Sequence, residues 1–409
     1  MRMWAIIFVV AIIGIIAAVW YVINRITRFR FIDYIEDKTI YKNKPRTTGK
    51  GADFGLPPKN KGEEDNNNNT KKKVKKSWLR RLIAVLLFIV VLAILTICFS
   101  YVEAFVILLH LAVIWLLCEL IVLILRAFNI DLTHLKVYVA GIGAVSITII
   151  YMVIAYILGS FVYITNYEID TGKNIEPVRI VQIADSHLGV SMNKDTFPRE
   201  VEKIKSLNPD MVLITGDYVD DNSSLEQLEE CTKALSTINC KYGVFYSFGN
   251  HDKGMINNNN RGYDANKLVE ILEANNVKVL EDEIVNLDNQ YLLIGRADKS
   301  NRDRIPIQQL VDTIDPNEFA NEYSIVMDHQ PNDYDAEAAA KVDLVLSGHT
   351  HGGQFLPINR IGEIVGANDY TYGHKTIDKT DFIVTSGIAC WAMRFKTGTK
   401  SEIVVIDVK

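Results

Sequence analysis

The sequence predicts an α/β domain preceded by membrane-spanning helices, and three observations lead to this prediction. Long uncharged apolar runs are confined to residues 1–165, whereas residues 166–409 have the composition of a globular domain. In the second part, short apolar runs rich in Val and Ile alternate with helix-like segments, an order that favours an α/β fold. These apolar runs do not alternate with polar residues, so we expect sheets that are covered on both faces.

Four segments of the first part are long and apolar enough to cross a bilayer as helices. They lie at about residues 3–23, 82–102, 104–125 and 137–163. The first has a longer apolar core than a cleavable signal and no clear small-residue cleavage site, so we expect it to be retained. Residues 24–81 form a basic loop with 17 Lys/Arg against 7 Asp/Glu. Its stretch 51–76 is rich in Gly, Pro, Asn and Lys and almost free of large apolar residues, which predicts disorder.

The distribution of charge predicts an orientation and excludes one class of partner. Basic loops stay on the cytoplasmic side, so a multi-pass cell-membrane protein is predicted with loop 24–81 cytoplasmic and residues 166–409 extracytoplasmic. Residues 1–165 carry 20 Lys/Arg and 10 Asp/Glu, a net +10, and the remainder carries 24 and 39, a net −15. So acidic a domain is not expected to bind nucleic acid, because phosphate contacts need clustered basic groups. The expected partner of the apolar part is the lipid bilayer.

Three features allow two interpretations each. Lys71–Lys76 form either part of a solvated loop or a contact with anionic lipid. His110 and Glu119 lie within the third span and are either functional groups or polar groups that face neighbouring helices. Cys231 and Cys240 are either a disulfide bridge or two separate thiols.

The elements of the α/β part are predicted from apolar runs and from the turn residues that bound them. Strands are expected at Val178–Ala184, Met211–Thr215, Tyr242–Phe248, Val277–Val279, Tyr291–Gly295, Ser324–Met327, Leu344–Leu346, Phe382–Thr385 and Ile403–Val408. Helices are expected at Phe197–Leu207, Leu225–Ile238, Tyr263–Asn275 and near Ala336–Ala340. In this order of elements, the functional site is expected at the carboxyl ends of the strands.

Residues able to bind metal ions follow several of these strands. They are Asp185 and His187 in DSH, Asp217 and Asp220 in GDYVD, Asn250 and His251 in GNHD, His329 in DHQP, and His349 and His351 in GHTH. Residues i and i+2 of an extended chain point the same way, so DSH and GHTH can each direct two side chains at one ion. Each motif alone is weak evidence. Histidines at the ends of four separate buried strands, however, are not expected of independent core residues.

With these motifs in this order, the sequence resembles the calcineurin-like metallophosphoesterase superfamily over roughly residues 178–408. The residues of DHQP and GHTHGGQFLP are similar to those of the bacterial membrane-anchored branch. The closing segment SGIACWAMRFKTGTKSEI is also similar to that of this branch, but matches it less closely. The resemblance implies that residues 166–409 form a four-layer α/β/β/α sandwich of two mixed sheets. It also implies hydrolysis of a phosphate ester by metal-activated water, with two divalent metal ions.

The resemblance further implies a role for each site residue. One metal ion would be held by Asp185, His187 and His351, and the other by Asn250, His329 and His349. Asp217 would bridge both ions, His251 would contact the scissile phosphate and assist the leaving group, and Asp220 would orient His251. Oxygen and imidazole ligands without thiolate suit Mn, Fe or Zn.

The substrate is expected to be a phosphomonoester or a phosphodiester, and the four spans motivate a lipid or cell-envelope ester as a hypothesis. Lys253 and Arg394 are candidate substrate-binding residues, and the alternative for each is an exposed surface residue. Asn257–Asn260 and Arg261 form a polar insertion that is a candidate for shaping substrate entry. The alternative function is a non-catalytic metal-binding scaffold or sensor that retains the fold. The complete ligand set, together with His251, argues against that alternative.

Overall fold

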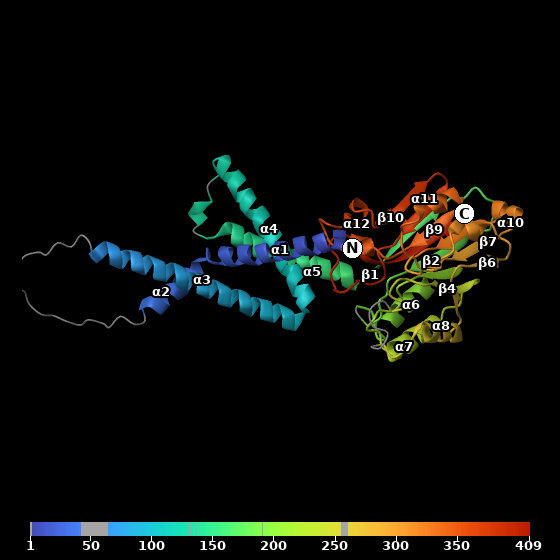
Figure 1. The fold of residues 1–409 in the computed structure, drawn as a ribbon, viewed down its shortest axis with the longest axis horizontal. Coiled ribbons are helices and arrows are strands. Elements are labelled where there is room, and N and C mark those ends of the chain that lie inside the picture. The colour runs from blue at the N-terminus through green and yellow to red at the C-terminus, as the bar shows by residue number, and fades with distance from the viewer. Residues whose placement is uncertain (1, 42–63, 131, 136, 190, 255–260) are drawn as a thin grey trace, which may run out of the picture. The chain divides into compact units, whose positions relative to one another are not determined.

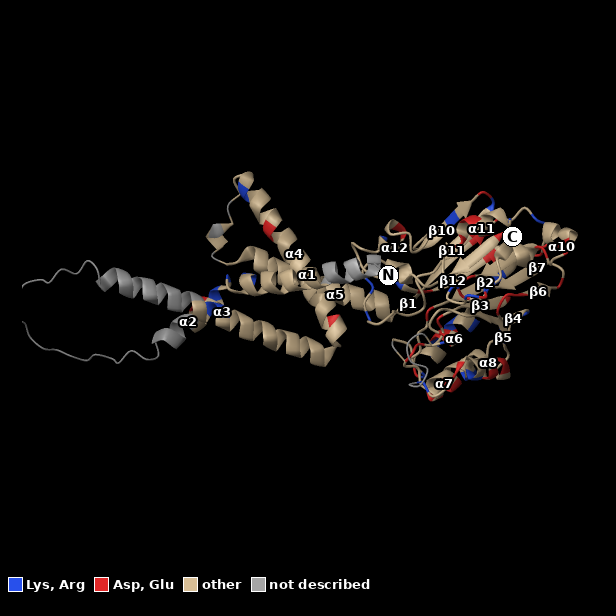
Figure 2. Cartoon of the chain, viewed as in Figure 1, with Lys and Arg blue, Asp and Glu red and all other residues tan. Residues whose placement is uncertain are grey.

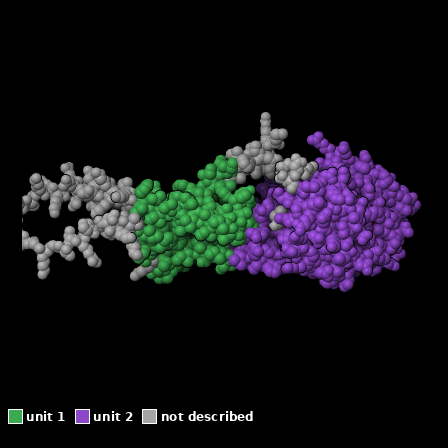
Figure 3. Space-filling model, turned by 90° about the horizontal axis from the view of Figure 1, so that it is seen from below, with its two compact units in different colours: residues 1–151 green, residues 152–409 purple. Residues whose placement is uncertain are grey.

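The computed structural model describes residues 2–41, 64–130, 132–135, 137–189, 191–254 and 261–409, with side chains described for 12–35 and, in these ranges, from residue 78 onward (Figure 1). The chain divides into two compact units, residues 1–151 and 152–409 (Figure 3). The first unit is helical. Its helices are α1 (Arg2–Ile26), α2 (Arg30–Tyr41), α3 (Glu64–Cys98), α4 (Tyr101–Ala127), the short 3-10 helix Thr133–Leu135, and most of α5 (Val139–Ser160).

Three segments of the described chain have the length and hydropathy of a membrane span. They are Trp78–Cys98, Tyr101–Ala127 and Val139–Ser160. Figure 2 shows α5 without coloured, charged residues and α4 with only a few. Trp115 and Phe88 belong to the buried core of this unit, whereas Ile97 is apolar and 83% exposed. An apolar exterior of this kind suits a lipid environment.

The first predicted span, 3–23, lies within α1. Only the apolar stretch Ile12–Ile26 of that helix has described side chains, and it is shorter than the three spans above.

The basic loop 24–81 differs from its prediction at both ends. Residues 64–76, expected to be disordered, belong to α3, and residues 30–41 form α2. Ile32 is fully buried against the helices, and Asp33 forms an ion pair with Arg80, so tertiary packing stabilises α2. Extending α3 from its apolar span towards the N-terminus costs little free energy, because adding residues to an existing helix is easier than starting one. Residues 42–63 lie outside the described residues.

Glu119 is paired within the helical unit. Its carboxylate lies 2.8 Å from Arg25 and 2.9 Å from Arg28, and it accepts a 2.5 Å hydrogen bond from the Tyr138 hydroxyl. This cluster joins α1, α4 and the residue before α5. Glu119 therefore has a structural explanation, because it pairs with two arginines that follow the first predicted span, a pairing that the sequence had not indicated. His110 Nδ1 lies 2.8 Å from the Val106 carbonyl oxygen on the preceding turn.

Two six-stranded mixed sheets form the second unit. The first has the order β1 (Val162–Ile169), β12 (Ser401–Val408), β2 (Val178–Ile183), β3 (Met211–Thr215), β4 (Gly243–Ser247) and β5 (Val277–Leu280). The second has the order β10 (Gly373–Ile377), β11 (Thr380–Val384), β9 (Leu344–Ser347), β8 (Tyr323–Met327), β7 (Tyr291–Gly295) and β6 (Glu283–Leu287). The central strands β2, β3 and β4 run parallel in the first sheet, and β7, β8 and β9 run parallel in the second.

Three apolar layers separate the two sheets and their helices. Alternate residues of one strand enter different layers, as when Val181 of β2 faces the helices and Ile180 faces the other sheet. The outer layer of the first sheet is packed by α6 (Phe197–Ser206), α7 (Leu225–Leu235) and α8 (Ala265–Ala274). The outer layer of the second sheet is packed by α9 (Ile307–Val311) and α11 (Tyr334–Ala339). The short helices α10 (Pro316–Asn321) and α12 (Ile361–Ile364) complete the unit. The four-layer α/β/β/α sandwich is thereby confirmed.

The end of the last predicted span needs correction. Helix α5 ends at Ser160, and Val162 begins β1, which pairs with β12 in parallel along its whole length. The predicted span 137–163 and the boundary at 165/166 therefore cut into the sheet. Phe161–Ile164 continue the apolar composition of the helix, so hydropathy does not reveal the change to strand geometry.

The cysteines are separate thiols. Cys231 and Cys240 are both free, Cys231 being buried and Cys240 partly exposed. The interpretation as two thiols is confirmed, and no bridge constrains this part of the fold.

Candidate metal centre

The motif residues meet at the carboxyl ends of five strands. DSH follows β2, GDYVD follows β3 and GNHD follows β4 in the first sheet, while DHQP follows β8 and GHTH follows β9 in the second. Parallel strands of one sheet end at the same edge. The fold therefore brings together residues that are up to 166 positions apart, from Asp185 to His351.

Five of these residues adopt an unusual backbone conformation. Asp185, His187, Asp217, His349 and His351 have φ between 38° and 68°, in the left-handed region. Residues other than Gly rarely adopt this conformation, which costs roughly 1–3 kcal/mol each and is concentrated at functional sites. Backbone hydrogen bonds hold the strained turns together, for example His187 N to Asp217 O at 3.1 Å.

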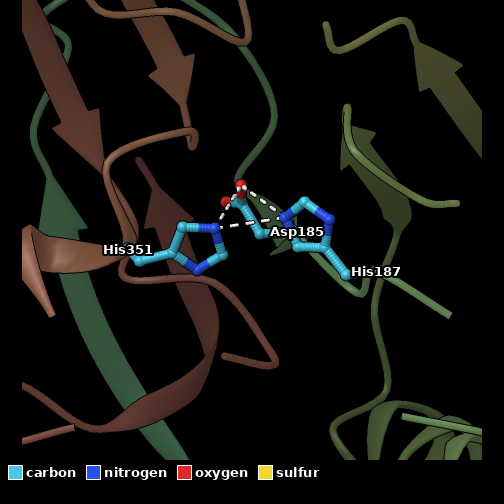
Figure 4. Close-up of side chains that lie close together, drawn as sticks. All are labelled: Asp185, His187 and His351. Carbon is cyan, nitrogen blue, oxygen red and sulfur yellow. Dashed lines mark hydrogen bonds and ion pairs between the residues drawn. The ribbon is translucent and has the colours of Figure 1, made fainter. Parts of the chain in front are cut away.

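The first cluster consists of Asp185, His187 and His351, all of them buried (Figure 4). The Nε2 atoms of the two histidines are 3.1 Å apart, and they lie 3.9 Å (His187) and 3.5 Å (His351) from Asp185 Oδ1. Figure 4 shows both rings directed towards the Asp185 carboxylate. Two imidazole nitrogens and a carboxylate that converge in a buried site are a set of donor atoms suited to a cation.

The second cluster consists of Asp217, His329 and His349. His329 Nδ1 donates a 2.8 Å hydrogen bond to the Thr215 carbonyl oxygen. In the neutral ring this bond leaves Nε2 as an acceptor, and Nε2 lies 3.1 Å from Asp217 Oδ2. The backbone N–H of His349 donates to both oxygens of Asp185 at 3.0 Å, which ties the second cluster to the first.

Asp217 lies between the two clusters. Its Oδ2 is 3.7 Å from His187 Nε2 as well as 3.1 Å from His329 Nε2, and its Oδ1 accepts a 2.9 Å hydrogen bond from His251 N. This position fits the bridging role that the resemblance implies. Asn250 lies in the same turn, directly before His251.

Burial and mutual interaction perturb the pKa of nearly every group in the site. Burial raises the pKa of the Asp185 carboxyl. Burial also raises the pKa of Asp217, but the facing His329 and His187 rings outweigh it and hold that pKa below its ordinary value. Burial and the neighbouring His329 lower the pKa of His349 to about 4, and burial with His187 lowers the pKa of His351 well below its usual range. Such a concentration of perturbed groups marks a functional site.

The residues present fit a pair of metal ions. Each cluster offers oxygen and imidazole nitrogen atoms and no thiolate, and Asp217 is shared. His329 Nε2, which is an atom of the second cluster, and His251 Nδ1 are buried and have no hydrogen-bond partner among the described residues. Lone pairs that are collected in this way, without protein donors, are costly unless a cation or ligand binds there.

A comparison with known protein families agrees with this geometry. Residues 178–353 match the family model of the calcineurin-like phosphoesterases. The second unit is a calcineurin-like phosphoesterase domain. The match ends at the GHTHGG turn, the last segment that contributes metal-competent residues.

Relatives of the phosphoesterase domain occur in bacteria and animals. The chain is 29% identical over 235 residues to an uncharacterized metallophosphoesterase of Campylobacter jejuni, covering 57% of this chain and 59% of that protein. It is 28% identical to one of Aquifex aeolicus, covering 63% and 98%. A Danio rerio protein called transmembrane protein with metallophosphoesterase domain is 26% identical, with coverage of 58% and 54%. The chain thus spans about three fifths of the first curated relatives.

Asp220 has a different partner from the one expected in this phosphoesterase domain. Its Oδ2 lies 3.0 Å from His187 Nδ1, and no hydrogen bond to His251 is found in the described structure. The ligand atoms of His187, Asp220 and His251 nevertheless lie within 4.8 Å of one another. The Asp220 backbone N–H donates to Ser223 Oγ at 2.7 Å, which holds the turn so that the carboxylate faces His187. Asp220 thus orients a metal-competent histidine directly.

Three supporting residues escaped the sequence analysis or were given another role. Asp252 is buried and accepts hydrogen bonds from the N–H groups of Asp217, Val219 and Gly249. Arg261, expected beside the substrate entry, is 3% exposed and donates to the carbonyl oxygens of His251 and Asp252. It therefore braces the GNHD turn, while Asn257–Asn260 lie outside the described residues. The only indication of Asp252 in the sequence was its position as the last residue of the GNHD motif.

A third residue, Trp391, lies at the edge of the site. Its ring centroid is 6.4 Å from that of His251, and 47% of the residue is exposed. The closing segment SGIACWAMRFKTGTKSEI contains it, but the sequence assigned it no role.

The two candidate substrate-binding residues differ in their surroundings. Lys253 forms an ion pair with Glu281 and lies 4.6 Å over the Phe248 ring, so its charge is already paired. Arg394 is partly exposed in the segment that follows Trp391, and the backbone there packs against Gly159. These contacts favour the interpretation of Lys253 as an exposed surface residue over that of a substrate-binding residue.

Proposed function

We propose that this chain is a membrane-anchored phosphoesterase that uses two divalent metal ions to hydrolyse a phosphomonoester or phosphodiester. The observation that carries the proposal is the position of Asp217, which lies within 3.7 Å of a histidine in each of two buried clusters. A single structural metal ion needs no shared carboxylate between two such clusters, whereas a pair of ions does.

The proposed ligand sets follow from these clusters. Asp185, His187 and His351 would hold one ion, Asn250, His329 and His349 the other, and Asp217 both. The donor atoms suit Mn, Fe or Zn. When bound, a pair of such ions polarises the phosphoryl group and lowers the pKa of bound water.

His251 is the proposed catalytic residue of the chain itself. Its backbone is fixed by the hydrogen bond to Asp217, and its ring lies 5.1 Å from the ring of His187. Since Nδ1 has no hydrogen-bond partner among the described residues, the ring is not committed to a structural bond. We assign it to contact the phosphate and to give a proton to the leaving oxygen.

The membrane anchor supports a lipid or cell-envelope ester as the substrate. Three helices of the chain are long and apolar enough to span a bilayer, and the last of them, α5, leads into β1 after a single residue, Phe161. A site so tethered samples esters near the bilayer at a high effective concentration.

Hydrolysis of a chromogenic phosphodiester by the full-length protein tests this function. A fragment starting at residue 170 would lack β1 and is therefore unsuitable. The purified protein is stripped of metal and then supplied with manganese, in parallel with the matching phosphomonoester. Turnover that depends on manganese supports the proposal. Tight metal binding without turnover of either ester would favour the scaffold, and failure to bind metal would reject both.

A further inference from the structure

A group of large apolar side chains is exposed on two segments of the second unit, one of which follows the GHTHGG turn of the metal centre. It comprises Leu356, Ile358, Ile361, Ile364 and Trp391, here called the apolar rim, which are 42%, 59%, 50%, 78% and 47% exposed. Four of them lie in the segment that follows the GHTHGG turn, and Ile361 and Ile364 are one turn apart on α12. Exposed apolar side chains gathered in this way mark a contact with a partner or a membrane.

The apolar rim is joined to the site through Gln354. The Gln354 side chain donates to the Trp391 carbonyl oxygen at 3.1 Å and accepts from the Trp391 N–H at 3.3 Å. Leu356 N donates to Thr397 Oγ1 at 2.8 Å, so residues 354–356 and 391–397 form one layer. Because the Trp391 ring centroid lies 6.4 Å from that of His251, one member of the rim lies at the proposed catalytic residue.

The same layer packs against the end of α5. Lys396 N donates to the Ala155 carbonyl oxygen at 3.1 Å, and Ser401 Oγ donates to that of Gly159 at 2.8 Å. Gly159 allows this close approach, since a Cβ there would meet Arg394 O at 2.8 Å. The ring of Tyr156 lies 6.2 Å from that of Phe395. All of these residues belong to the second unit, and Figure 1 shows α12 and β1 at the same end of it.

We propose that the apolar rim inserts into the interface of the bilayer that α5 spans, and that the metal centre acts on the phosphate ester of a membrane lipid. We choose the bilayer as the partner of the rim because backbone hydrogen bonds join the segment after Trp391 to the end of α5, which is long and apolar enough to span a membrane. Trp residues favour the membrane interface, and exposed Ile residues on a short helix suit shallow burial there. The choice of a lipid as substrate rests on the proposed phosphoesterase function, whereas the insertion does not.

The depth of the rim in a bilayer tests the insertion independently of activity. Ile361→Cys is labelled with bimane in the full chain carrying Cys98→Ser and Cys240→Ser, and the protein is placed in nanodiscs of brominated phosphatidylcholine. Cys118, Cys231 and Cys390 are buried and are retained. Strong quenching at 361 is expected, with none at the control Ile305→Cys, which is 38% exposed outside the rim. Equal, weak quenching at both positions would overturn the insertion.

The substrate class is tested with the triple variant Ile358→Ser, Ile361→Ser, Ile364→Ser and with Ile305→Ser as its control. The probes are phosphatidic acid and phosphatidylglycerol in nanodiscs and a soluble chromogenic diester. We expect about tenfold slower lipid hydrolysis in the triple variant and an unchanged soluble rate. Wild-type turnover of the soluble diester without hydrolysis of either lipid would overturn the lipid assignment. Equal lipid rates in all variants would overturn the part of the rim in presenting the lipid. Absence of any turnover would refute the phosphoesterase function itself, while the quenching would still report on insertion.

Discussion

At the scale of single residues, Asp217 connects the two halves of the proposed metal centre. Asp217→Ala removes the carboxylate within reach of His187 and His329, so both ions lose a ligand. We expect loss of bound metal and of all hydrolysis, measured by elemental analysis and by the chromogenic assay. Asp195→Ala, on the exposed loop before α6, is the control and should retain both. Retention of both ions by Asp217→Ala would contradict the bridging role.

His251 is expected to behave in the opposite way. It is assigned to the phosphate and not to a metal ion, so His251→Ala should keep the metal content. Loss of a positioned proton donor should slow hydrolysis by roughly 10²–10⁴-fold. Measuring metal content and rate on one sample separates the two effects, and an emptied metal site would show that His251 is a ligand.

Asp220 gives a sharper test, because its observed partner differs from the expected one. A carboxylate that accepts from a ligating histidine fixes the ring and raises its basicity, and its loss typically costs 10–100-fold in metal affinity. Asp220→Ala should therefore weaken metal binding by about that factor, and excess manganese should restore the rate. A metal titration of variant and wild type measures this. Unchanged metal affinity with slower hydrolysis would instead support the expected role of Asp220 in orienting His251.

The identity of the site residues could be predicted from the sequence, but several of their contacts could not. The strand ends bring Asp185 and His351 together whatever the detail of the turns. The partner of Asp220, by contrast, depends on the tight turn held by Ser223, which spacing does not encode. Arg261 was expected to help shape substrate entry as part of a polar insertion, yet it is buried and donates to carbonyl oxygens of the GNHD turn.

At the scale of elements, a buried charge cluster holds the loop that carries His329. Arg296 follows β7 and is 2% exposed, and its guanidinium contacts Asp328 at 3.0 Å, Asp333 at 2.7 Å and Glu337 at 3.1 Å. Burial and the neighbouring Asp328 raise the pKa of Glu337 well above its ordinary value. Arg296 thus joins the loops after β7 and β8 and the helix α11, and Arg304 also contacts Asp328.

Arg296→Leu should destabilise the second unit strongly. Removing the cation leaves the buried Glu337 carboxyl without its arginine and leaves Asp328 with Arg304 alone. Breaking a buried ion pair in this way typically costs about 3–5 kcal/mol. Chemical denaturation followed by the fluorescence of the second unit measures the change. Arg302→Leu, at an exposed position, should change stability by less than about 0.5 kcal/mol. A similarly small effect for Arg296→Leu would mean that solvent reaches the cluster after the substitution.

Burial explains which elements could be predicted from the sequence. The central strands β2, β3 and β8 are apolar on both faces and stand out from their surroundings. The edge strands β6 and β10 are partly exposed and contain polar residues among the apolar ones, so no continuous apolar run marked them as strands. Strand β1 was hidden for the opposite reason, because its first residues extend the apolar run of α5.

At the scale of the whole molecule, the sign of the charges argues for one orientation. Arg25 and Arg28 at the end of α1 contact Glu119 of α4, and Arg80 of α3 pairs with Asp33 of α2. The basic residues therefore gather at one end of the helical unit, where loop 24–81 also begins and ends. Placing so many Lys and Arg residues outside would violate the positive-inside tendency.

This orientation predicts the accessibility of single cysteines in intact cells. In the background Cys98→Ser, Cys240→Ser, the variant Ser300→Cys carries its thiol on the exposed surface of the phosphoesterase domain, and Thr47→Cys carries it in loop 24–81. A membrane-impermeant maleimide should label Ser300→Cys in intact cells and Thr47→Cys only after lysis, as judged by gel shift. The reverse pattern would place the metal centre in the cytoplasm. The rim would then face the inner leaflet, and the lipid substrate would have to be sought there, although the geometry of the site would be unchanged.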